Sequence, residues 1–238
     1  MDKCPICREQ LNDPICREQL NDLLLDTGAK IDMKDVLGRT ALIMASDEGH
    51  TETVKLLLAK GANLETKNNF GRTALMLASM EGGMETTKLL LDAGANLEAK
   101  DDKGETALIW ASLFGRVEIV KLLLDRGAKI EVKDGQSGTA LIWASWNGYI
   151  EIVKLLLDRG AKIEAKDTEG RTALMRASDE GHTETVKLLL DTGANIEAED
   201  NKGQTALTRA SAKQAEVDDL DFFNDLIEVV KLLSMARN

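Results

Sequence analysis

Few side chains in this 238-residue chain are placed to do chemistry together. Acid–base and nucleophilic catalysis both need two groups within hydrogen-bond reach of one substrate. The only histidines, His50 and His182, lie more than half the chain length apart. Neighbouring acidic residues such as Asp47 and Glu48 could be imagined as acid and base, but such pairs are typical of a solvated surface. With no nucleophile–base pair and no Gly-rich phosphate loop, we expect no catalytic residue and no enzyme.

The cysteines raise the possibility of a metal site. Cys4-Pro-Ile-Cys7 resembles the opening of a RING-type zinc finger, a domain found in many ubiquitin ligases, but only Cys16 follows nearby. A closed zinc site needs four ligands, so we predict no metal and no cofactor and interpret these cysteines as incidental thiols. Three cysteines also form no disulfide framework, which favours a reducing cytoplasmic or nuclear compartment.

The elements that would position any site recur every 33 residues. The triplet Thr-Ala-Leu begins at Thr40 and returns five times at this spacing, and Lys-Leu-Leu-Leu begins at Lys55 and returns four times. Self-similarity with a fixed period of this size is typical of a solenoid.

One copy, residues 106–128, shows how the unit is built. Thr106 is a good N-cap, and small or apolar residues follow at i, i+3 and i+4 on one helix face. Gly115 breaks this first helix, and Gly127 fits the left-handed position after a second one. A single helix pair cannot bury its own apolar faces, so neighbouring copies must stack. The inward-facing residues are Leu108, Ala111 and Ser112, then Ile119, Val120, Leu123 and Leu124.

A unit of this pattern resembles the ankyrin repeat, and the resemblance covers roughly residues 20–238. It implies an all-α solenoid of helix-turn-helix pairs with extended or hairpin fingers. It also implies that the first helices and the fingers line a concave surface that grips partners. Two departures are the alanine at the family's helix-opening proline and the Ile, Met or Thr at its following histidine, so that histidine's hydrogen bond is not expected. In the first full copy the match is carried by Asp35, Gly38, Thr40, Leu42, Ala45, Gly49, His50, Leu57, Leu58, Gly61 and Ala62.

The period divides the chain into three parts. Residues 1–34, which contain a perfect nine-residue duplication, are interpreted as a degenerate N-terminal capping repeat. Residues 35–199 hold five full repeats, and the finger of the fourth is expected to be shifted or more mobile, since Ser137 replaces its glycine. Residues 200–238 form a modified last repeat whose 11-residue insertion, near 215–225, is expected to lengthen the loop or add a short helix.

The copies differ on a second face of the first helix, and this face is the candidate site. It is aromatic in the third and fourth copies and polar or charged in the terminal ones. An apolar patch rimmed by charge usually marks an interface. For Trp110 and Trp143, mutual stacking as structural packing is an open alternative. The predicted partner-binding residues are Phe70, Met80, Trp110, Leu113, Phe114, Trp143, Trp146, Asn147 and Tyr149.

Composition narrows the class of partner. The net charge of −11 argues against nucleic acid, because phosphate contacts need Lys and Arg. No apolar run approaches the ~20 residues of a membrane span, so no membrane partner is expected. We predict a non-catalytic scaffold that acts as a monomer. It binds a protein with a basic rim through its central repeats. The alternatives are a substrate adaptor for a ubiquitin ligase, and a structural protein that associates weakly with itself.

Overall fold

The computed structural model describes residues 30–215 and 220–237. These residues form 12 helices and no strand, as expected for an all-α repeat solenoid. The capping repeat predicted for residues 1–34 and the Cys4–Cys7 motif lie almost wholly outside this part of the chain. The helices are α2 (Ala41–Asp47), α3 (Thr51–Ala59), α4 (Ala74–Glu81), α5 (Met84–Asp92), α6 (Ala107–Leu113), α7 (Val117–Asp125), α8 (Ala140–Trp146), α9 (Ile150–Asp158), α10 (Ala173–Asp179), α11 (Thr183–Asp191), α12 (Ala206–Gln214) and α13 (Leu220–Ala236).

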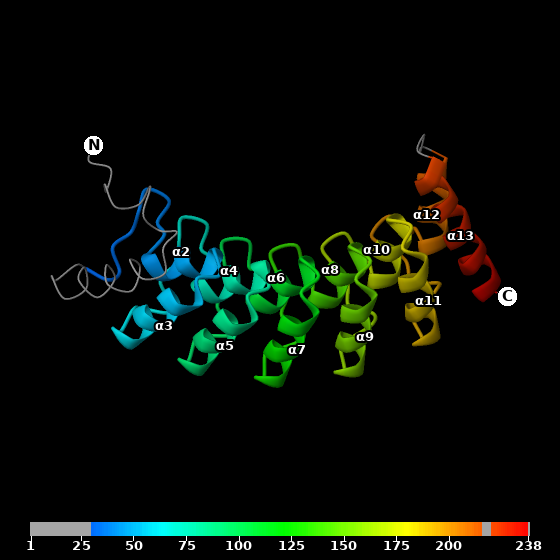
Figure 1. Cartoon of the computed structure of the whole chain (residues 1–238). Helices are drawn as coiled ribbons and strands as arrows, with labels where there is room; N and C mark the ends of the chain where they lie inside the picture. The colour runs from blue at the N-terminus through cyan, green and yellow to red at the C-terminus, as the bar shows by residue number, and fades with distance from the viewer. Residues whose placement is uncertain (1–29, 216–219, 238) are drawn as a thin grey trace.

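The helices stack in two layers along a gently curved row, with α2 and α13 at opposite ends of the row (Figure 1). The first helices of successive repeats, α2, α4, α6, α8, α10 and α12, pack side by side in one layer. The second helices α3, α5, α7, α9 and α11 form the other layer, and α13 packs against α11 and α12. Each layer is therefore built only from contacts between neighbours, as a solenoid requires.

Local signals set the helix ends where the sequence predicts them. The Thr106 hydroxyl accepts a hydrogen bond from the backbone N–H of Ile109 at 3.4 Å. Gly127, after the second helix, has φ of 88°, the left-handed conformation that favours glycine. The predicted inward face is also confirmed, because Leu108 is 2 % exposed and Ala111 and Ser112 are fully buried.

The connecting segments, or fingers, join one repeat to the next through hydrogen bonds. The backbone N–H of Asp102 donates to the carbonyl of Phe70 at 3.2 Å, and that of Gly135 donates to the carbonyl of Lys103 at 2.7 Å. Lysine side chains also connect neighbouring repeats. For example, Lys100 Nζ donates to the backbone carbonyl of Lys133 at 2.8 Å. The fingers therefore form a continuous edge without regular strands among the described residues.

The fourth finger keeps the register of its neighbours, so the shift expected from Ser137 is absent. Ser137 adopts φ of 57° and is the one described residue other than glycine with positive φ. Its N–H donates to the carbonyl of Asp134 at 3.0 Å, and Thr168 N–H reaches the carbonyl of Gln136 at 2.8 Å. The stacked fingers on either side hold serine in a conformation that it otherwise disfavours.

Of the inserted residues that the structure describes, 220–225 lengthen the second helix of the last repeat. α13 has 17 residues, against nine in each preceding second helix, because apolar residues at helical spacing continue through the insertion. Leu226, Val229 and Leu233 are fully buried against the stack. On the outer side of α12, the exposed Thr208 occupies the place of Met175, which is 1 % exposed in the repeat before. A polar residue suits this side of α12, because Thr208 is exposed there among the described residues.

Ser137→Gly is expected to raise the free energy of unfolding by about 0.5–1 kcal/mol, because glycine adopts positive φ without the steric cost of a Cβ. Gly170→Ser is the matched control at the same finger position. Its φ is 78°, and a Cβ there would lie 2.4 Å from Asn201 Oδ1, so we expect destabilisation of about 1–3 kcal/mol. Urea unfolding of the two variants measures both, and an unchanged midpoint for Ser137→Gly would contradict the strain argument.

Candidate functional site

In the third and fourth repeats, an aspartate at the start of the finger holds a tryptophan of the first helix. Asp101 Oδ1 accepts backbone hydrogen bonds from Lys103 N (2.9 Å) and Glu105 N (2.8 Å), which closes the finger turn. Asp101 Oδ2 accepts from Trp110 Nε1 at 3.2 Å. In the next repeat Trp143 Nε1 donates to Asp134 Oδ2 at 2.7 Å. Both indoles are thus pinned against the helix layer and are only 5 % and 7 % exposed.

The two tryptophans pack on rings of their own helices. Trp110 stacks on Phe114 with centroids 5.5 Å apart and planes 18° apart, while Trp143 contacts Trp146 at 5.1 Å and 49°. Among the described residues, no ring contact joins Trp110 to Trp143, so the mutual stacking considered above is absent. Phe114 and Trp146 remain 40 % and 36 % exposed.

Arginines lie between the aromatic rings along the same face. The guanidinium carbon of Arg72 is 4.3 Å from the Trp110 ring centroid and 5.5 Å from that of Phe70. The Arg176 guanidinium carbon is 5.6 Å from the Trp146 ring. These distances are those of cation–π contacts. The rings and guanidinium groups therefore form two clusters, one across the second and third repeats and one across the fourth and fifth.

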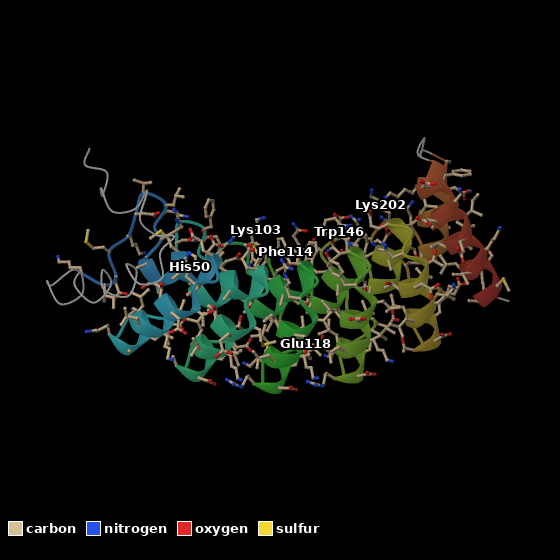
Figure 2. The ribbon with its side chains drawn as sticks, viewed as in Figure 1. His50, Lys103, Phe114, Glu118, Trp146 and Lys202 are labelled. Atoms are coloured by element: carbon tan, nitrogen blue, oxygen red, sulfur yellow. The ribbon has the colours of Figure 1, made fainter. Side chains whose placement is uncertain are left out.

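The exposed rings of Phe70, Phe114 and Trp146 are called here the aromatic patch. Figure 2 shows Phe114 and Trp146 on the side of the molecule that also carries the finger residue Lys103, whereas Glu118 lies on the opposite side. Phe70 is a finger residue and is 56 % exposed. The patch therefore draws on one finger and on the C-terminal ends of α6 and α8, and it belongs to the face that the fingers overhang.

The remaining predicted residues surround the patch with different degrees of exposure. Met80 and Leu113 are partly buried against the core. Asn147 is exposed and donates from Nδ2 to the carbonyl of Trp143 at 3.0 Å. Tyr149 is partly buried, with its ring over Gly115. Three of these four residues are therefore partly buried, and Asn147 alone among them is exposed.

Glu105 is a buried carboxyl group that the sequence analysis missed. It is 6 % exposed, and its Oε2 has no hydrogen-bond partner. Burial raises the pKa of Glu105 to about 7, with further contributions from the charge of Asp101 and a hydrogen bond to that carboxylate. Asp134 adds to the rise, and Lys103 opposes it. A signal was available, because arginine occupies this finger position at Arg39, Arg72 and Arg171.

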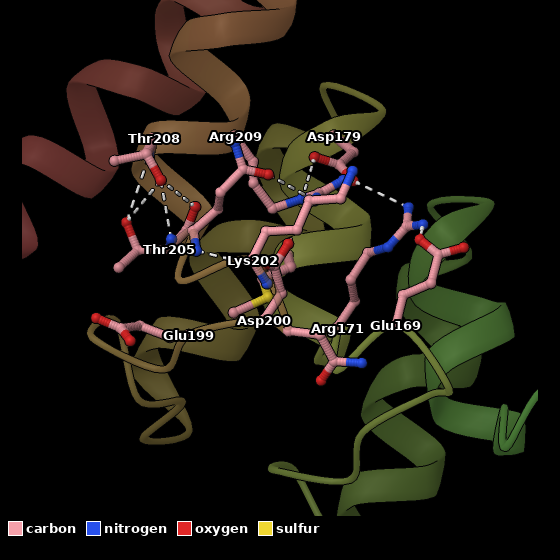
Figure 3. A network of polar contacts seen from close by, with 12 residues as sticks. Glu169, Arg171, Asp179, Glu199, Asp200, Lys202, Thr205, Thr208 and Arg209 are labelled. Atoms are coloured by element: carbon pink, nitrogen blue, oxygen red, sulfur yellow. Dashed lines mark hydrogen bonds and ion pairs between the residues drawn. The ribbon is translucent and has the colours of Figure 1, made fainter.

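A second missed feature is an ionic network in the fifth and sixth repeats (Figure 3). Arg209 lies between two carboxylates, donating to Asp179 Oδ2 at 2.6 Å and to Asp200 Oδ2 at 2.7 Å. Arg176 donates to Asp167 Oδ2 at 2.5 Å. Arg176 and Arg209 stand nine residues after the finger aspartate, where the third and fourth repeats carry tryptophan. The same anchoring carboxylate thus holds either an indole or a guanidinium.

A family model described as ankyrin repeats matches residues 15–101, 61–134, 87–167 and 141–234, which together cover most of the chain. The chain belongs to the ankyrin-repeat family. None of the curated proteins compared with it gives a match. Ankyrin repeats form protein–protein interaction domains and are typically non-catalytic. Membership of this family therefore confirms the general prediction that the chain is a protein-binding module.

The two histidines occupy equivalent places at the start of second helices in the ankyrin repeats. His182 Nε2 lies 3.0 Å from the carbonyl oxygen of Trp146 in the preceding repeat, and its ring covers Gly148. His50 Nε2 is 2.8 Å from a carboxylate oxygen of Glu48. Across the described residues, no cluster of three or more His, Cys, Asp or Glu could hold a metal ion. Across the same residues, no helix is both long and apolar enough to cross a membrane.

The buried carboxyl of Glu105 predicts a pH-dependent stability. Its pKa is higher in the folded state, at about 7, than its ordinary value of 4.5, so the folded state binds the proton more tightly. This stabilisation is complete below about pH 4.5 and is lost as pH rises through about 7, for a total of about 3 kcal/mol. Glu105→Gln should remove this component. Urea unfolding at pH 5, 6, 7 and 8 measures it, with wild type and variant compared at each pH.

Other groups titrate in this pH range as well, so the difference between the two proteins is the informative quantity. Tryptophan fluorescence gives an independent readout, because Glu105 contacts the aspartate that holds Trp110. If the free energies of unfolding of wild type and Glu105→Gln change with pH by the same amount, a raised pKa at Glu105 is contradicted.

Proposed function

We propose that this ankyrin-repeat protein is a non-catalytic scaffold that binds another protein through the aromatic patch, which is centred on its third and fourth repeats. The observation that supports this most directly is that Phe114 and Trp146 are exposed at positions where the repeat fold does not require an aromatic ring. In other repeats, Glu48 and Glu81 occupy the position of Phe114, and Asp47 and Asp179 occupy the position of Trp146. Apolar rings at positions that tolerate charge indicate a surface kept for contact.

The exposed rings can supply specific binding energy. An aromatic side chain presents roughly 150–250 Å² in full, and about two fifths of Phe114 is accessible. Covering that part contributes on the order of 2 kcal/mol, before ordering costs, and Trp146 contributes a similar amount. Two neighbouring aromatic anchors ringed by weaker contacts are the usual anatomy of a binding hot spot.

Charge around the patch favours a protein partner with a basic rim. The chain has a net charge of −11, and the exposed Glu48, Glu81 and Asp102 lie on the helices and fingers that border the patch on its N-terminal side. Such a field accelerates the approach of a basic surface and disfavours nucleic acid. We place the protein in the cytoplasm or nucleus and propose that it acts as a monomer, with residues 1–34 as a cap. A ubiquitin-ligase adaptor role rests only on Cys4 and Cys7 and stays a prediction.

The double variant Phe114→Ala, Trp146→Ala should lose partner binding by about a hundredfold or more, because both anchors are removed. Its free energy of unfolding should fall by less than about 2 kcal/mol, since both rings are partly solvated. The measurement is affinity capture from lysate of the source cells with wild type and variant, followed by mass spectrometry. Binding constants are then measured for proteins that are lost selectively.

Trp143→Ala is the matched control, since Trp143 is 7 % exposed and hydrogen-bonded to Asp134. It should lower the free energy of unfolding by about 3–5 kcal/mol. Identical capture by wild type and the double variant would reject the aromatic patch as the binding surface. A mass that increases with protein concentration in light scattering, and falls in the double variant, would instead show that the patch pairs two copies.

A further inference from the structure

Arg171 is held differently from the arginines at equivalent finger positions. Arg39 pairs with the aspartate of its own finger, Asp35, at 2.8 Å, and Arg72 lies against the rings of Phe70 and Trp110. Arg171 is 16 % exposed at its side chain, and its buried Nε has no hydrogen-bond partner. The Nε of Arg72 also has no hydrogen-bond partner, but the Arg72 guanidinium is covered by those two rings, whereas no ring contact to Arg171 is found among the described residues.

The buried carboxylates near Arg171 are occupied by other groups. Asp179 accepts from Arg209 Nε at 3.0 Å and from its Nη2 at 2.6 Å, whereas Arg171 Nη1 lies 3.8 Å from the same carboxylate. Asp167 binds Arg176 through Oδ2 and two backbone N–H groups through Oδ1. Burial lowers the pKa of Arg171, and the charges of Arg176 and Arg209 lower it further.

The close ionic partner left to Arg171 is Glu169 of its own finger tip, whose side chain is 58 % exposed. Beside this pair lies a depression of about 450 Å³ between the fifth and sixth fingers. Its charged lining consists of Arg171, Lys202 and Arg209 with Glu169 and Asp200, which leaves one positive charge in excess (Figure 3). That excess matches a single carboxylate, while the two acidic residues disfavour a phosphate or a polyanion.

A chain of contacts through Arg176 and Asp167 links the depression to the aromatic patch. Arg176 contacts the Trp146 ring at 5.6 Å and also binds Asp167, whose other oxygen accepts from the backbone N–H of Arg171 at 2.9 Å. A segment that covers Trp146 and runs toward the C-terminal repeats therefore arrives at Arg171. Both features lie on the face that the fingers overhang, where Figure 2 shows Trp146 and Lys202.

We propose that this depression receives the side-chain carboxylate of one aspartate or glutamate in the partner segment that covers the aromatic patch, and that Arg171 binds it in place of Glu169. This inference rests on the proposed function. Guanidinium and carboxylate form a charge-assisted, bidentate pair in a partly buried setting. The pair fixes the direction in which the segment lies along the repeats.

The probe is a library of random peptides displayed on phage and selected on the full chain. Parallel selections use Arg171→Gln and the double variant Phe114→Ala, Trp146→Ala. We expect wild type to enrich peptides with an acidic residue at a constant distance from an apolar anchor, and Arg171→Gln to lose the acidic preference. Glutamine is compatible with this finger position, since Gln204 occupies it in the last repeat.

The strongest peptide is then compared with its carboxamide counterpart, in which Glu becomes Gln or Asp becomes Asn. The carboxamide should bind wild type at least about tenfold more weakly, whereas Arg171→Gln should bind both peptides equally. Glu169→Gln should strengthen acidic-peptide binding about two- to fivefold by removing the internal competitor. Arg39→Gln is the charge-matched control and should leave the ratio of the affinities for the acidic peptide and its carboxamide unchanged. Thermal unfolding checks that each variant folds.

The outcomes separate this inference from the proposed function. Peptides that need Phe114 and Trp146 but bind equally well as carboxamides overturn the carboxylate site and leave the proposed function standing. Acidic peptides that need Arg171 but ignore the double variant support the site and contradict the aromatic patch. A triple variant combines Phe114→Ala, Trp146→Ala and Arg171→Gln. If selection on wild type enriches no peptide that selection on this triple variant does not, both the carboxylate site and the proposed function are overturned.

Discussion

Each finger depends on the side chain that opens it, which is aspartate in five described repeats and Asn68 in the other. One oxygen accepts two backbone N–H groups and closes the turn, as Asp101 Oδ1 does. The second oxygen of the aspartates at 101, 134, 167 and 200 binds the side chain nine residues later on the first helix. The backbone can therefore repeat faithfully while the residue held at that place, indole or guanidinium, gives each repeat a different surface.

Much of the fold could be predicted from the sequence because its signals are local. The capping threonines, the glycines after second helices and the apolar helix faces each act within one or two turns, and their 33-residue recurrence requires neighbours to stack. Ser137 shows where local reasoning fails. Its own preference is against positive φ, but hydrogen bonds from Thr168 to Gln136 and from Gly135 to Lys103 hold the finger in register. The stacked neighbours outweigh the preference of one residue.

The candidate site was only partly predictable, because two of its determinants lie outside the helix that presents it. A helical face places Trp110 and Phe114 together, as found, but does not show that the finger folds over Trp110 and binds its N–H. That contact joins residues nine apart, and its signal is the recurrence of aspartate with tryptophan or arginine at this spacing. Glu105 was missed for a similar reason, since its raised pKa depends on burial and on the charges of Asp101 and Asp134, which belong to two fingers.

Burial of Trp110 and Trp143 makes the exposed rings better binding elements. A solvated ring on a flexible helix end loses rotamer freedom when a partner covers it, and that loss reduces affinity. Phe114 rests on a tryptophan that is itself fixed by a hydrogen bond to Asp101, and Trp146 is held between Trp143 and Arg176. Their orientations are therefore set before a partner arrives. Because the anchoring carboxylates belong to the fingers, the fingers that keep adjacent repeats in register also hold the proposed binding surface in shape.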